Sequence, residues 1–160
     1  MPAAAARVTV PPDSSGGGTI YSTVVVGTDG SATAEIALAR AIELSRLAGA
    51  TLHVVTVSDP GPRSASPGER RAAASTRPDF QADIALESAL ARLGAGDVEV
   101  RQHVITGEPA AEIVAIAQRE AADLVVLGSR GMRGAGRLLG SIPNKVSHRA
   151  PCDVLIVLTT

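Results

Sequence analysis

The chain has 160 residues, 45% of them apolar, and a formal net charge of −1 at pH 7, which predicts one soluble domain with a sizeable core. This charge balance excludes the basic footprint of a DNA- or RNA-binding protein, and a single Tyr, a single Phe and no Trp leave few rings for base stacking. No apolar run reaches membrane-spanning length and no secretory signal is present, so a cytoplasmic location is expected. The lone Cys152 excludes an intrachain disulfide and is expected to be buried and inert.

Residues 1–19 are rich in Pro, Ser and Gly and lack hydrophobic periodicity, which predicts a disordered tail before one domain over residues 20–160. The first predicted strand, 20–26, contains several β-branched residues and ends at a turn signal, Gly-Thr-Asp-Gly. Ser31 is the expected N-cap of a helix that runs to about Ala48, because apolar residues then recur at spacings of three and four.

The second predicted strand, 51–57, is apolar over most of its length, as expected of a strand covered on both faces in a parallel sheet. Residues 58–78 contain four prolines and a charged patch, so this stretch is interpreted either as a mobile linker or as a lid over a binding site. A helix is predicted over residues 80–93, with leucines on one stripe.

The third predicted strand, 98–105, alternates apolar and polar residues, which is typical of an edge strand with one wet face. Pro109 is well placed to begin a helix that runs to Glu120. A fourth strand over 124–127, a helix from Ser141 to about Arg149 and a last strand over 154–158 complete the chain.

This alternation predicts an α/β fold: a three-layer sandwich with a five-stranded, mostly parallel sheet, helices on both faces and right-handed crossovers. With the first strand central, the strand order is 3-2-1-4-5, and the switch in strand order falls between the first and fourth strands. Ligands bind such sheets at the carboxyl ends of the strands beside that point. Asp29 and Val57 are therefore expected near the loop that starts at Gly128.

The loop after the fourth strand carries five glycines, at 128, 131, 134, 136 and 140, directly before the predicted helix start at Ser141. Glycines allow backbone N–H groups to approach an anion closely, and a helix start adds unpaired donors. The loop lacks the lysine of a Walker A motif and the spacing of a dinucleotide fingerprint. It is interpreted as a phosphate cradle, with a flexible connection that binds nothing as the alternative.

Two segments resemble the universal stress protein family: VVVGTDGS at residues 24–31 and GRLLGSIPNKVSHRAPCDVLIV at residues 136–157. The nucleotide-binding branch of that family carries G-x2-G-x9-G-[ST], and this chain offers Gly128-x2-Gly131 followed by Gly140-Ser141. The gap between Gly131 and Gly140 holds eight residues, one fewer than the family pattern. The resemblance covers about residues 20–160, has an actinobacterial character, and implies a Rossmann-like fold of the adenine nucleotide alpha hydrolase type.

The resemblance also implies a nucleotide-binding set, in which Asp29 and Val57 contact the base and Leu127 lines its pocket. Ribose and phosphates would be bound by backbone groups of the glycines, by the Ser141 hydroxyl and by the Ile142 N–H. The complete set is Thr28, Asp29, Val57, Leu127, Gly128, Arg130, Gly131, Gly140, Ser141 and Ile142. Simpler roles stay open, because Asp29 can hold its own turn, Ser141 can act only as an N-cap, and arginines near the loop, like Lys145, can simply be solvated.

Residues suited to catalysis are absent near the loop: it has no His–Asp–Ser set, no carboxylate pair and no nucleophile elbow. His53, His103 and His148 are far apart in the sequence and fit no zinc spacing, so no metal-ligating group is expected among them. Asp29 and Asp59 offer carboxylates for Mg²⁺ at the phosphates. The sequence therefore favours a binding protein, or at most a slow ATP hydrolase.

Three hypotheses follow from the resemblance. The first is an ATP-binding regulatory stress protein that forms a homodimer through its last strand. The second is a protein that binds or sequesters cyclic AMP, because a shortened loop fits a monophosphate better than a triphosphate. The third is a stress protein that binds protein partners without a nucleotide. None of the three involves nucleic acid or a membrane.

Overall fold

The structure, a computed structural model, describes residues 19–58, 78–129 and 141–159. The predicted tail up to residue 18, residues 59–77 of the predicted linker or lid, and residues 130–140 of the glycine loop lie outside this range. The strands are β1 (Thr23–Thr28), β2 (Thr51–Ser58), β3 (Val100–Thr106), β4 (Leu124–Gly128) and β5 (Asp153–Val157). The helices are α1 (Ala32–Ala48), α3 (Pro78–Arg92), the short 3₁₀ helix η1 (Ala95–Asp97), α4 (Pro109–Arg119) and α5 (Ser141–Ser147).

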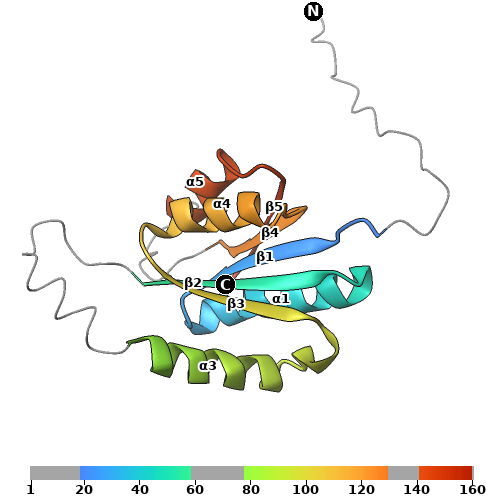
Figure 1. Ribbon diagram of the computed structural model, residues 1–160, viewed down its shortest axis with the longest axis vertical. Helices are drawn as coiled ribbons and strands as arrows, with labels where there is room; N and C mark the ends of the chain where they lie inside the picture. Colours follow the sequence, from blue (N-terminus) through green and yellow to red (C-terminus); the bar gives the residue numbers. More distant parts are fainter. Residues whose placement is uncertain (1–18, 59–77, 130–140, 160) are drawn as a thin grey trace, which may run out of the picture.

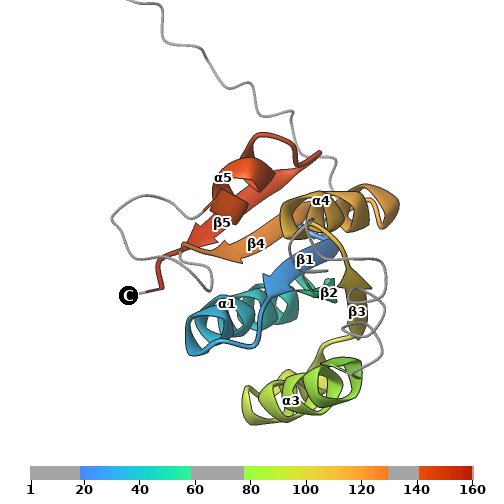
Figure 2. The same ribbon diagram turned by 90° about the vertical axis from the view of Figure 1, so that its left-hand side faces the viewer.

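The strands form one parallel sheet in the order β3-β2-β1-β4-β5, which confirms the predicted fold and strand order. β1 pairs with β2 on one side and with β4 on the other, so it is the central strand from which the chain departs in both directions. α1 and α3 cover one face of the sheet, whereas α4 and α5 cover the other (Figures 1 and 2). The molecule is therefore a three-layer α/β sandwich.

Two apolar clusters fill the spaces between the layers because side chains alternate along the strands. On β1, Val24 and Val26 belong to the cluster beneath α1 and α3, whereas Val25 belongs to the cluster beneath α4 and α5. All three valines have no exposed surface. This double covering explains the near-continuous apolar runs in the central strands.

Local signals in the sequence set several helix boundaries. The Ser31 side chain accepts a hydrogen bond from the Ala34 N–H, and Gly49 ends α1 in the left-handed conformation at φ 65°. Pro109 occupies the first turn of α4, and the Glu108 side chain accepts from the Ala111 N–H. These caps confirm the predicted starts of both helices.

The structure differs from the sequence-based expectations in a few places. β3 begins two residues later than predicted, α3 begins at Pro78, and η1 had no counterpart among the predicted elements. Cys152 is partly buried rather than fully buried, and this burial raises the pKa of its thiol, with Asp153 and Asp123 acting in the same direction. Within the described ranges, no helix combines the length and the apolar character needed to cross a bilayer.

Candidate functional site

The carboxyl ends of β1, β2 and β4 bring several of the predicted site residues to one edge of the sheet. Thr28 pairs with Thr56, and Val57 is the next residue on β2. Thr28 and Gly128 each lie two residues beyond the paired Val26 and Val126. Thr28 and Gly128 end β1 and β4, and Val57 is the last residue but one of β2, so the three lie at a similar level with Asp29 directly after β1. We refer to this region as the carboxyl edge.

The turn after β1 is held by its own side chains. Asp29 Oδ1 accepts a hydrogen bond from the Ser31 N–H at 2.9 Å, and Thr28 Oγ1 accepts from the Gly30 N–H at 3.2 Å. Gly30 has φ 74°, a conformation that glycine adopts without strain. The simpler expectation for Asp29, that it stabilises this turn, is therefore confirmed, and it leaves a ligand-binding role as a compatible prediction.

The two apolar residues assigned to the base pocket lie on the face covered by α4 and α5. Leu127 is only 3% exposed, and Val57 packs partly buried against the same cluster. An added Cβ at Gly27 would lie 2.9 Å from Leu127 Cδ2 and 2.7 Å from Ile113 Cδ1. Leu127 is thus a core residue beside a closely approached glycine, and its contact with a base remains a prediction.

The chain leaving β4 is anchored to the end of β5. The Ser129 N–H donates to the Val157 carbonyl at 2.7 Å, and Ser129 Oγ accepts from the Thr159 N–H at 3.1 Å. Ile142, one residue into α5, packs against the cluster beneath α4 and α5. The two described ends of the glycine loop therefore rest on the sheet. Arg130, Gly131 and Gly140, together with Asp59, lie outside the described residues, as does the Ser141 side chain.

Lys145, considered as a counter-charge for phosphate, has a carboxylate partner in the structure. Its Nζ lies 2.9 Å from Glu108 Oε1, and this contact is the largest influence that lowers the pKa of Glu108. Because Glu108 also caps α4, the ion pair links the start of α4 to α5. A phosphate would have to compete with Glu108 for this lysine.

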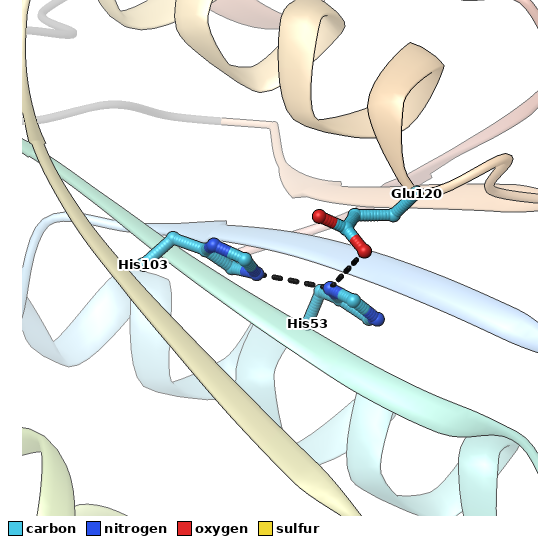
Figure 3. A group of neighbouring side chains, drawn as sticks. All are labelled: His53, His103 and Glu120. Carbon is cyan, nitrogen blue, oxygen red and sulfur yellow. Dashed lines mark hydrogen bonds and ion pairs between the residues drawn. The ribbon is translucent and has the colours of Figure 1, made fainter.

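At the other end of α4, away from the carboxyl edge, three side chains from separate elements converge (Figure 3). His53 Nδ1 lies 2.9 Å from His103 Nε2 and 4.0 Å from Glu120 Oε2. The two rings are stacked with centroids 5.1 Å apart. The premise that the histidines lie far apart is wrong for this pair, because positions 50 residues apart in the sequence lie on adjacent strands. The expectation that they bind no metal stays a prediction.

Charge and burial act together on this histidine pair. Burial is the main cause that lowers the pKa of both imidazoles, and the charges of Arg101 and Arg119 act in the same direction, whereas Glu120 opposes them. His53 is 2% exposed, and His103 and Glu120 are partly buried. The signal available in the sequence was one histidine on each of two strands predicted to be neighbours. In the structure their positions on β2 and β3 differ by two in register, so both side chains point to the same face.

Asp123, just before β4, hydrogen-bonds the chain at the start of β1, at the end of the sheet opposite the carboxyl edge. Its Oδ2 accepts hydrogen bonds from the Ser22 N–H at 2.7 Å, from Ser22 Oγ at 2.6 Å and from the Thr23 N–H at 2.9 Å. These bonds lower the pKa of Asp123. The residue therefore joins the starts of β1 and β4, a structural role that sequence reasoning missed because the contact spans about 100 positions.

Comparison with known proteins decides the family. The model of the universal stress protein family matches residues 20–157, which is most of the chain. The chain belongs to the universal stress protein family. A universal stress protein of Mycobacterium tuberculosis is 38% identical over 145 residues, with 88% of this chain and 98% of that protein covered. One of Methanocaldococcus jannaschii is 32% identical, with 88% of this chain and 84% of the relative covered.

Solved structures agree with this assignment, and two of them are complexes with a nucleotide. A universal stress protein in complex with cyclic AMP is 34% identical, with a TM-score of 0.67 and coverage of 88% of this chain and 99% of that one. An Archaeoglobus fulgidus universal stress protein in complex with dAMP is 27% identical, with a TM-score of 0.61 and coverage of 86% and 98%. A Lactobacillus plantarum structure reaches a TM-score of 0.78 at 22% identity, over 86% and 97%, and supports the fold alone.

Proposed function

We propose that this universal stress protein binds an adenine nucleotide at the carboxyl edge and has a regulatory role in a stress response. The observation that carries the proposal is the relative that is 34% identical, covered almost completely by this chain, and solved with cyclic AMP. The strand order supports it, because the edge formed by β1, β2 and β4 lies at the switch point of a parallel sheet. In this proposal Asp29 and Val57 contact the base, and Gly128 with the glycine loop and Ser141 contacts ribose and phosphate.

We infer that adenosine monophosphates, cyclic AMP foremost, are the first ligands to test. Two related structures contain a monophosphate, and the loop between Gly131 and Gly140 is one residue shorter than in the nucleotide-binding pattern. A shorter loop has fewer backbone N–H groups for distal phosphates. ATP, with or without Mg²⁺, is the second candidate, because the glycine spacing and Ser141 otherwise follow that pattern.

The proposal is tested by mass spectrometry of any ligand carried through purification, followed by titration calorimetry with cyclic AMP, AMP and ATP. We expect cyclic AMP or AMP to bind more tightly than ATP, and Mg²⁺ to change this order little. Tighter binding of ATP would favour the second candidate. No heat with any of the three nucleotides at millimolar concentration would contradict nucleotide binding altogether.

Two serines of α5 provide a matched pair of variants. Ser141→Ala removes the hydroxyl proposed to contact the ligand, whereas Ser147→Ala removes one that only donates to the Asn144 carbonyl at the far end of the same helix. A hydrogen bond to a charged group contributes about 1.5–3 kcal/mol, so Ser141→Ala should weaken binding by about tenfold or more. Equal affinities of the two variants would remove Ser141 from the site.

We further propose that the protein forms a homodimer through β5. This strand is at the edge of the sheet, and two leucines, Leu155 on it and Leu158 just after it, are 36% and 72% exposed. Exposed apolar residues on an unpaired edge favour pairing with a second strand. Light scattering on the full chain at micromolar concentration should give twice the mass of one chain, and Leu155→Asp should reduce it to one. A monomeric parent protein would contradict the proposal.

A further inference from the structure

The group formed by His53, His103 and Glu120 is separate from the carboxyl edge and plays no part in the proposed nucleotide site. Its three donor atoms, one from each side chain, lie within 4.8 Å of one another. They come from β2, from β3 and from the residue that follows α4, so their meeting depends on the fold (Figure 3).

We propose that His53 Nδ1, His103 Nε2 and the Glu120 carboxylate bind a first-row transition metal ion, with Zn²⁺ as the best-fitting candidate. Two imidazole nitrogens and one carboxylate make up a ligand set that zinc uses with a water molecule in the fourth position. Hard cations such as Mg²⁺ and Ca²⁺ prefer sites made of oxygen alone. The site joins two strands to the end of α4, where a bound ion would brace three elements.

The distances require only small movements to admit the ion. Around a tetrahedral Zn²⁺ with Zn–N bonds of about 2.0–2.1 Å, two ligand nitrogens lie about 3.3 Å apart. His53 Nδ1 and His103 Nε2 are 2.9 Å apart, so the rings must separate slightly. Glu120 Oε2 must move toward His53 from its present 4.0 Å, and its side chain, 23% exposed, has room to do so. His103 and Glu120 are only partly buried, so two of the three ligand residues are in contact with solvent.

Without metal, the same atoms form a hydrogen-bonded series. Arg119 Nη2 donates to His103 Nδ1 at 3.2 Å, which places the His103 proton on Nε2, from where it points to His53 Nδ1. A metal ion would replace that proton, and His103 would then carry its proton on Nδ1, facing the Arg119 donor. Arg119, which is also bonded to Glu120 Oε1 at 2.8 Å, must therefore release His103 when the ion binds.

Because of this conflict, a substitution at Arg119 can distinguish a metal site from a purely structural histidine pair. In Arg119→Gln the amide oxygen can accept the Nδ1–H of metal-bound His103, which is the kind of outer hydrogen bond that orients metal-ligating histidines. We therefore expect Arg119→Gln to bind Zn²⁺ several-fold more tightly than the parent protein. If the histidines serve only as a hydrogen-bonded structural pair, the same variant gains no affinity for metal.

The experiment uses the full chain without an affinity tag, stripped with a chelator, and Zn²⁺ is titrated in competition with a chromophoric chelator. We expect one Zn²⁺ per chain, and at least a tenfold loss of affinity in His103→Asn and in Glu120→Gln. His148→Asn and Glu87→Gln, which change exposed residues elsewhere, are the matched controls and should bind as the parent does. Co²⁺ in place of Zn²⁺ should show the intense visible absorption of a four-coordinate site.

Folding of each variant is checked by circular dichroism, and the buried His53 is left unchanged for that reason. A measurement on the parent alone removes any dependence on variants: in long-range ¹H–¹⁵N spectra, Zn²⁺ should shift His53 Nδ1 and His103 Nε2 but neither nitrogen of His148. Unchanged imidazole signals, or equal affinity in parent, His103→Asn and His148→Asn, would overturn the proposal. Since no nucleotide is present, failure of the nucleotide proposal would not affect this outcome.

Discussion

The two ends of the sheet are built in different ways. At the carboxyl edge, the turn after β1 is held locally: Asp29 accepts from the N–H two residues later, and Thr28 does the same with Gly30. The longer contacts at this edge are backbone-centred, as where Ser129 bonds Val157 and Thr159. At the other end, Asp123 reaches Ser22 and Thr23 about 100 positions away, and His53 meets His103 on the next strand. The turn after β1 thus bonds its own N–H groups, whereas the side chains of Asp123 and of the two histidines join separate strands.

This contrast predicts that substitutions at the carboxyl edge weaken ligand binding more than stability. Substitutions at the opposite end should lower stability and leave ligand binding unchanged. Side chains at the carboxyl edge sit beside residues proposed to contact a nucleotide, and they contribute modestly to the stability of the fold. Side chains at the opposite end hold the starts of the strands and lie far from that edge. Paired substitutions, one at each end, test this division directly.

The largest effect is expected from Asp123→Ala compared with Asp29→Ala. Asp123 accepts three hydrogen bonds, and its loss leaves the part-buried Thr23 N–H without this partner, while water can reach the exposed Ser22 donors. The free energy of unfolding should therefore fall by about 2 kcal/mol. Asp29 accepts one from a turn, and its loss should cost about 1 kcal/mol. Urea unfolding measures both values, while nucleotide affinity should fall only in Asp29→Ala. Equal losses of stability would show that the two ends are not built differently.

A smaller effect is expected where the carboxyl edge meets the core. A methyl group at Gly27 would lie 2.7 Å from Ile113 Cδ1 and 2.9 Å from Leu127 Cδ2, and such overpacking costs about 1–3 kcal/mol. Gly27→Ala should therefore lower the urea midpoint. Gly96→Ala is the matched control, because nothing lies within 4 Å of an added Cβ there. If both variants unfold at the same urea concentration, the close packing around Gly27 is not as the structure describes.

The same contrast explains what could be predicted from the sequence. Strand order, the Ser31 cap, the start of α4 at Pro109 and the edge character of β3 follow from alternation, capping residues and turn signals, all of which act over a few positions. The histidine pair was missed because separation along the chain does not give separation in space. The predicted strand order made the two strands neighbours, but the register that puts both side chains on one face is a property of the structure. The Asp123 contacts depend on side-chain direction at strand starts, which no local pattern encodes. The ligand remains a prediction, since residues 130–140 lie outside the described ranges.

The smallest effect concerns pH at the end of the sheet that carries the histidines. The pKa of His53 and of His103 is lowered in the folded protein, chiefly by burial, with Arg101 and Arg119 adding to the effect and Glu120 opposing it. The unfolded chain, with histidine pKa values of about 6.5, therefore binds more protons as the pH falls below that value. Stability is thus fully present above about pH 6.5 and declines as the pH falls toward the lowered folded values.

Urea unfolding in the presence of a chelator, compared between pH 7.5 and pH 5.5, measures this decline while the carboxylates stay ionised. His103→Asn should lose less stability over this interval than the parent, because one of the two lowered groups is gone and His53 no longer faces a second imidazole. His148→Asn, at an exposed position after α5, should behave as the parent does. A parent protein whose unfolding is independent of pH over this range would mean that the pair titrates as it does in the unfolded chain. Burial between β2, β3 and α4 would then not lower the pKa values of His53 and His103, in contrast to what their contacts predict.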